Sequence, residues 1–124
     1  MFSNNKNTSG KHMICDLKEI KNIELLNNNN KIKELFDNIC KKYNYTILNQ
    51  IEHIFEPQGL TILYLLSESH ISIHTFPERN YAALDIYTCR EYENNNIYEE
   101  IYEYIIKEFK AKKEEPIIID RKFF

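Results

Sequence analysis

Apolar residues recur at helical spacing in two segments of the chain. In the first, between Lys31 and Tyr43, they fall at i, i+3, i+4 and i+7, which predicts a helix with one buried stripe. Its members are Ile32, Leu35, Phe36, Ile39, Cys40 and Tyr43. The second segment predicts a longer helix over Ile97–Lys110. Its inward side chains are Ile101, Tyr104, Ile105 and Phe109.

Other segments have the pattern of β-strands. Most alternate apolar and polar residues, whereas Leu60–Leu66 is nearly all apolar and predicts a central strand covered on both faces. A turn signal at Glu56–Gly59 separates this strand from the one before it. The expected strands are His12–Asp16, Thr46–Phe55, Leu60–Leu66, Ile71–Phe76, Tyr81–Thr88 and Pro116–Asp120, the last at a sheet edge.

The predicted order is β-α-β-β-β-β-α-β, with hairpin-length connections between the middle strands. This order predicts one α+β domain over residues 1–124, an antiparallel sheet with both helices on one face. The other face of the sheet is then uncovered. Packing against the same face of a second copy would cover it, so we expect a homodimer arranged as a four-layer αββα sandwich.

Composition narrows the class of protein. A net charge of −3 argues against a nucleic-acid partner, which requires a concentrated basic surface. No apolar run approaches the length of about 18 residues that a membrane span requires, and the N-terminus carries no apolar targeting segment. The cysteines are three, an odd number, and form no Cys-x-x-Cys pair. We therefore expect a reducing, cytoplasmic location with no membrane partner.

Candidate chemistry is concentrated in the segment Leu65–Glu78. If this segment contains a strand, His70, Ser72 and His74 lie on the same face of it. We expect them to lie a few ångströms from the turn at Glu68–Ser69. The combination of serine, histidine and acid beside apolar strands suggests a reactive site supported by a sheet.

Several familiar sites fit this segment poorly. A zinc site from His70, His74 and Cys89 has no close ligand pair of known spacing. A serine hydrolase would normally show Gly-x-Ser-x-Gly, and a cysteine hydrolase built on Cys89 and His74 has no supporting motif. Residue by residue, the plainest interpretation is a polar turn at Ser69 and a hydrogen-bonded strand histidine at His74.

The segment as a whole resembles the prokaryotic, short-chain (class 1) S-adenosylmethionine decarboxylase proenzymes. The resemblance rests on LSESHISIHTFPE at Leu66–Glu78, followed by YAALDIYTC at Tyr81–Cys89. Weaker support comes from Gly10–His12 and from Phe55–Gly59. The similarity runs from about Gly10 to Asp120, nearly the whole chain.

This resemblance implies that the protein cuts its own chain. The Ser69 Oγ atom would attack the carbonyl of Glu68 and convert the peptide bond into an ester. His74 would help to break the ester by β-elimination, acting on the Cα proton. The products would be a β chain of residues 1–68 and an α chain of residues 69–124.

The α chain would then begin with a pyruvoyl group derived from Ser69. In this family the pyruvoyl group takes the place of pyridoxal phosphate: it forms a Schiff base with the substrate amine and accepts electrons as CO₂ leaves. No metal is expected to be required. Cys89 is the implied acid that reprotonates the substrate carbon, a role that suits a thiol because it is mostly protonated at neutral pH.

The resemblance also implies substrate-binding residues. Phe55 matches a position whose ring stacks on adenine, and Thr61 a position that often carries a small hydroxyl residue. Glu78 matches an acid that could bind ribose hydroxyls, from the partner subunit. Two positions depart from the family pattern: Phe76 replaces the usual tryptophan, which removes an N–H donor, and Arg79 adds a cation where an uncharged residue is usual.

The implied function is conversion of S-adenosylmethionine to its decarboxylated form and CO₂, for spermidine and other polyamine biosynthesis. Two alternatives remain open at this point. The same pyruvoyl chemistry could act on arginine or ornithine, although Arg79 would disfavour a cationic substrate. A non-catalytic homologue that regulates a partner is also conceivable, but the set of Glu68, Ser69, His74 and Cys89 is intact.

Overall fold

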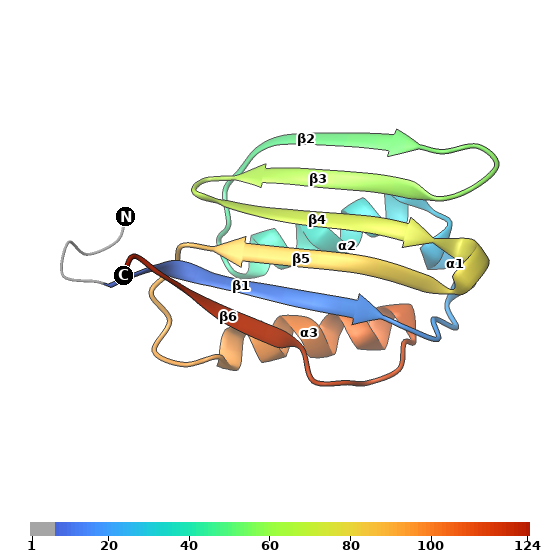
Figure 1. Ribbon diagram of the computed structural model, residues 1–124. Helices are drawn as coiled ribbons and strands as arrows, with labels where there is room; N and C mark the ends of the chain where they lie inside the picture. The colour runs from blue at the N-terminus through green and yellow to red at the C-terminus, as the bar shows by residue number, and fades with distance from the viewer. Residues whose placement is uncertain (1–6) are drawn as a thin grey trace.

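The computed structural model describes residues 7–124 as one antiparallel sheet with helices on one of its faces (Figure 1). The strands are β1 (Thr8–Leu17), β2 (Ile47–Ile54), β3 (Leu60–Leu66), β4 (Ser69–Phe76), β5 (Tyr81–Thr88) and β6 (Ile117–Lys122). The helices are α1 (Ile23–Leu26), α2 (Asn29–Lys42) and α3 (Asn96–Phe109), with a short 3-10 helix, η1, at Pro77–Arg79. Spatially the strands run β2-β3-β4-β5-β1-β6, and neighbours are antiparallel. The α+β class predicted from the sequence is confirmed.

Individual elements differ from the prediction in informative ways. Strand β1 extends beyond His12–Asp16 at both ends, because it pairs with β5 on one side and β6 on the other. Strand β3 is not covered on both faces: its side chains alternate, and Leu63 and Leu65 are 41% and 54% exposed. The apolar run therefore marks an uncovered face within this chain. Helix α1 has only four residues, too few for a periodic pattern.

The core lies between the helices and the sheet. Helix α2 contributes Phe36 and α3 contributes Tyr98 and Phe109, all fully buried. They pack in the same apolar cluster as the odd-numbered residues of β4, Ile71 and Ile73. Burial of this apolar area is the main stabilising contribution to such a layer. None of the helices in residues 7–124 is long and apolar enough to cross a membrane.

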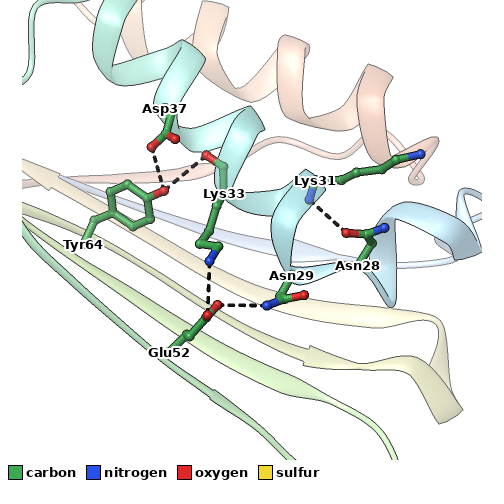
Figure 2. A network of polar contacts seen from close by, with 7 residues as sticks. All are labelled: Asn28, Asn29, Lys31, Lys33, Asp37, Glu52 and Tyr64. Atoms are coloured by element: carbon green, nitrogen blue, oxygen red, sulfur yellow. Dashed lines mark hydrogen bonds and ion pairs between the residues drawn. The ribbon is translucent and has the colours of Figure 1, made fainter.

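Asparagine side chains cap the starts of two helices. The Asn22 side chain accepts a hydrogen bond from the Leu25 backbone N–H, and Asn28 accepts one from the Lys31 N–H, at the starts of α1 and α2. Asparagine side chains supply an acceptor that the first helical turn lacks. The run around Asn28 is thus the beginning of a helix, as Figure 2 shows for its capping bond.

The edge strand β2 is tied to α2 by a network of polar contacts (Figure 2). The Lys33 Nζ atom lies 3.1 Å from Glu52 Oε1, and the Asn29 amide donates to Glu52 Oε2 at 3.2 Å. On the neighbouring strand, the Tyr64 hydroxyl is 2.7 Å from Asp37 Oδ1 and 3.2 Å from the Lys33 carbonyl oxygen. The network therefore connects the helix layer to the two outer strands β2 and β3.

We predict that Tyr64→Phe lowers the free energy of unfolding by about 1–2 kcal/mol, because it removes the hydroxyl by which the buried Tyr64 donates to Asp37 and to the Lys33 carbonyl. Urea denaturation checks this. The matched control is Tyr104→Phe: its hydroxyl makes only a 3.5 Å contact with Asn38 at the surface and should change stability by less than about 0.5 kcal/mol. Equal losses in the two variants would contradict the role given to the network.

Candidate active site

The predicted site residues form two groups at opposite ends of the sheet. Glu68, Ser69 and Cys89 make up the first, which we call the cleavage group; it lies at the β3–β4 turn and just beyond the end of β5 (Figure 1). The second, the binding group, lies at the other ends of β2, β3 and β4 and on η1. Its members are Phe55, Thr61, His74, Phe76 and Glu78.

The cleavage group is built on a two-residue turn. Leu66 pairs with Ser69, so only Ser67 and Glu68 connect β3 to β4. Glu68 has φ +59°, in the left-handed region that costs a residue with a side chain on the order of 1–3 kcal/mol. The Ser67 N–H donates to the Thr46 carbonyl at 2.9 Å and holds the turn in place. The Glu68–Ser69 bond thus lies in a strained, anchored segment.

Ser69 and Cys89 lie in contact beside this turn. Ser69 is 7% exposed, and its Oγ atom accepts a hydrogen bond from the Cys89 backbone N–H at 3.4 Å. The Cys89 Sγ atom lies 3.4 Å from Glu68 Oε2, with the thiol as donor. A serine hydroxyl, a thiol and a carboxylate therefore meet at one end of the sheet.

The electrostatics of this group favour the neutral thiol. Burial raises the pKa of Cys89 above its ordinary value, and the adjacent Glu68 carboxylate raises it further. Contacts with Ser69 and the backbone N–H act in the opposite direction but are smaller. Cys89 is consequently a protonated acid at neutral pH.

Two residues that the sequence analysis did not assign to the site hold the Cys89 segment. Gly10 has φ +133°, and a Cβ atom there would lie 2.0 Å from the Thr88 carbonyl oxygen and 2.7 Å from the Cys89 Cα atom. Only glycine permits this approach of β1. Arg90 donates to the Tyr43 carbonyl at 3.2 Å and also to that of Asn44, at the end of α2.

Arg90 could have been suspected from its place directly after Cys89, but nothing in the sequence predicts its contacts. Its guanidinium also lies 5.0 Å from the centre of the Tyr45 ring. For Gly10 a signal existed, because the chain has only two glycines and this one opens a strand.

In the binding group, His74 and Thr61 are directly opposite each other on β4 and β3, and their Nδ1 and Oγ1 atoms are 2.8 Å apart. The expectation that His74 lies near the Glu68–Ser69 turn is wrong. His74 lies five positions along the strand from Ser69, a separation of roughly 16 Å. The two side chains also lie on opposite faces, Ser69 towards the helices and His74 on the uncovered face.

The remaining members of the binding group are accessible. Phe55 follows β2 and is 48% exposed, with its ring 4.5 Å from that of His53. Phe76 is 40% exposed and packs at 5.7 Å against Tyr81. Glu78 lies on η1 and is exposed. These side chains are available to a ligand or to another protein chain.

His70 and Ser72 share the uncovered face with His74, as predicted, but His70 belongs to a different cluster. Its ring lies 5.6 Å from that of Tyr87 and 6.2 Å from that of His12, which pairs with Asp85 at 3.1 Å. Burial, and secondarily the charge of His12, lowers the pKa of His70. Within residues 7–124, no three His, Cys, Asp or Glu side chains are grouped so as to hold a metal ion.

This chain is similar to known proteins in both sequence and fold. The sequence profile of the family described as S-adenosylmethionine decarboxylase matches residues 11–122. An S-adenosylmethionine decarboxylase proenzyme from Sulfurihydrogenibium sp. is 40% identical over 114 residues, 92% of this chain and 83% of that protein. One from Prochlorococcus marinus is 46% identical over 80 residues, 64% of this chain.

The chain spans only 63% of the length of the Prochlorococcus relative and 58% of one from Pyrococcus horikoshii. Among solved structures, that of the adenosylmethionine decarboxylase from Aquifex aeolicus superposes with a TM-score of 0.80 at 31% identity. The superposition covers 94% of this chain and 93% of that one. Sequence profile, relatives and fold agree, and the chain belongs to the S-adenosylmethionine decarboxylase family.

Proposed function

We propose that this protein is a self-processing, pyruvoyl-dependent decarboxylase that converts S-adenosylmethionine to decarboxylated S-adenosylmethionine and CO₂, a carboxy-lyase of polyamine and spermidine biosynthesis. The observation that carries the proposal is the contact of Ser69 with Cys89, and of Cys89 with Glu68, at a strained turn. The names of the relatives favour S-adenosylmethionine over arginine or ornithine as substrate.

Self-cleavage begins when the Ser69 Oγ atom attacks the Glu68 carbonyl carbon. The C–N bond breaks as the C–O bond forms, so the peptide becomes an ester and the Ser69 nitrogen a free amine. A base then removes the Ser69 Cα proton, and the Glu68 carboxylate leaves by β-elimination. The resulting enamine tautomerises to an imine, and water hydrolyses it to the pyruvoyl group with loss of ammonia. Strain at Glu68 favours the first step.

The base for the elimination comes from a second copy of the chain. Within one protomer His74 lies on the far end and the opposite face of β4, so it cannot reach Ser69. We infer that a two-fold axis through the uncovered sheet face brings the binding group of one protomer to the end of the sheet at which the other carries its cleavage group. Each of the two sites then contains His74 of one copy and Ser69 of its partner.

The uncovered sheet face is suited to such an interface. Over β2 and β3 it exposes Ile51, Leu63 and Leu65, which line a depression of about 370 Å³. Over β1 and β5 it carries the His12–Asp85 pair, which supplies polar specificity. Exposed apolar area of this kind favours association, and we propose a homodimer in which two sheets pack face to face.

In the processed enzyme the pyruvoyl group would supply the carbonyl that accepts electrons when CO₂ leaves. Cys89, held protonated, donates its proton to the carbon that has lost CO₂. Phe55 offers an exposed ring for the adenine and for cation–π attraction to the sulfonium. Like Phe55, both Phe76 and Glu78 come from the other protomer: the Phe76 ring closes the pocket, and the Glu78 carboxylate accepts from the ribose hydroxyls. Thr61 orients His74.

The cysteines are consistent with a reducing compartment. Cys15, Cys40 and Cys89 are unpaired and buried. Cys15 and Cys40 belong to the core, where burial raises their pKa to about 12 and about 11. Free thiols of this kind persist in the cytoplasm, where we place the enzyme.

The first test is the mass of the purified protein. We expect two fragments, residues 1–68 and residues 69–124 with a blocked pyruvoyl N-terminus, and CO₂ release from S-adenosylmethionine rather than from arginine or ornithine. Ser69→Ala should remain a single chain, because it lacks the attacking oxygen. Ser72→Ala, on the same strand, is the control and should cleave normally. An uncut wild-type chain after long incubation would overturn the self-processing proposal.

Cys89→Ala should still cleave, at least in part, but lose activity by roughly 10²-fold or more, because the acid is absent. The measurement is kcat for CO₂ release, corrected for the cleaved fraction determined by mass spectrometry. A Cys89→Ala enzyme as active as the wild type would remove Cys89 from the proposed mechanism.

The exchange of His74 between protomers can be tested with mixed dimers. His74→Ala alone should cleave roughly 10²-fold more slowly. Co-expressed with Ser69→Ala under a different tag, the His74→Ala chain should regain cleavage, because its partner supplies the histidine. Tandem purification shows whether the mixed dimer forms. A mixed dimer that forms without restored cleavage would show that His74 does not act across the interface.

A further inference from the structure

The proposed cleavage uses only the backbone carbonyl of Glu68 and leaves its side chain without a role. The structure places that side chain against the thiol: Glu68 Oε2 lies 3.4 Å from Cys89 Sγ, within hydrogen-bond range for sulfur. The turn conformation directs it there, since Glu68 adopts φ +59° between two strands that are otherwise regular.

We propose that Glu68 is a positioning residue for Cys89: its carboxylate accepts the hydrogen bond of the thiol, orients the S–H bond and keeps the proton on sulfur. The proposal deepens the function proposed above and rests on it for the use made of that proton. The contact itself does not depend on catalysis, so it can be tested in a chain that never cleaves.

The other groups around Cys89 do not supply a competing charge. Ser69, from β4, is neutral. Tyr98, from α3, is hydrogen-bonded to Thr88 at 2.6 Å, and burial raises its pKa to about 12, so it is uncharged. Arg90, in the same segment, directs its guanidinium to the end of α2. Glu68 is therefore the anion in contact with the thiol.

The same contact can persist after the chain is cut. Leu66 is buried, and the Ser67 N–H is bonded to the Thr46 carbonyl, so Glu68 stays within one residue of an anchored position. Cleavage converts its carbonyl into a carboxylate and adds a second negative charge next to Cys89. Negative charge disfavours the thiolate, so after processing the Cys89 thiol loses its proton less readily.

The test compares Ser69→Ala proteins that carry Glu68, Glu68→Gln or Glu68→Asp. Iodoacetamide reacts with the thiolate. The rate of Cys89 alkylation as a function of pH, followed by peptide mass spectrometry, therefore reports the protonation state of the thiol. Glu68→Gln removes the charge and should accelerate alkylation near neutral pH by roughly threefold. Glu68→Asp keeps the charge and should change the rate less. Glu34→Gln, an exposed residue of α2 that belongs to neither group of the site, is the control and should change nothing.

A Glu68→Gln profile that superposes on that of its parent, or lies below it, would overturn the proposal. In the self-cleaved enzyme, Glu68→Gln should also move the alkaline limb of kcat/KM to lower pH, since the acid is lost sooner. If alkylation responds as expected but the Ser69-containing protein neither cleaves nor releases CO₂, the Glu68–Cys89 contact stands and the proposed function fails. The two failures are thus distinguishable.

Discussion

The alternation of side chains along strand β4 is the constraint on which the rest of this structure depends. Ser69 faces the helices and His74 faces the uncovered side of the sheet, so two residues that we assign to one site lie on opposite surfaces of a single strand. No rotamer change can bring the two together within one chain. The uncovered apolar face and the separation of these residues are consequences of one geometry, and the homodimer that we propose would account for both.

In the cleavage group, the backbone segment around Cys89 is fixed by contacts with several other parts of the chain. The thiol segment is confined by a glycine of β1, by the bonds from Arg90 to the end of α2, and by the Glu68–Ser69 turn. These contacts come from segments far apart in the sequence. Because these contacts converge on the residue that we assign as the proton donor, small changes in the packing of β1 or α2 would change the position of the Cys89 thiol.

Much of the fold was predictable from periodicity alone. The order of the elements and the strand Tyr81–Thr88 followed from apolar spacing, which tertiary packing then reinforced. The pattern failed at Leu60–Leu66, because an apolar residue on an uncovered sheet face is indistinguishable in sequence from one in a core. The distance between Ser69 and His74 was misjudged for a related reason, since proximity along a strand was taken for proximity in space. The capping role of Asn28 was hidden because composition alone does not place a helix end.

The spatial order of the strands has a topological consequence for a chain cut between β3 and β4. Three strands, β1, β2 and β3, would belong to one fragment and β4, β5 and β6 to the other, yet β1 lies between β5 and β6. The fragments would be interleaved, so neither could depart without breaking the β3–β4, β5–β1 and β1–β6 pairings. Unfolding would then yield two chains, and its reversal would be a bimolecular association that dilution opposes. Such a protein folds as one polypeptide and, once cut, persists as a complex of two chains. After unfolding, the two chains would not readily refold together.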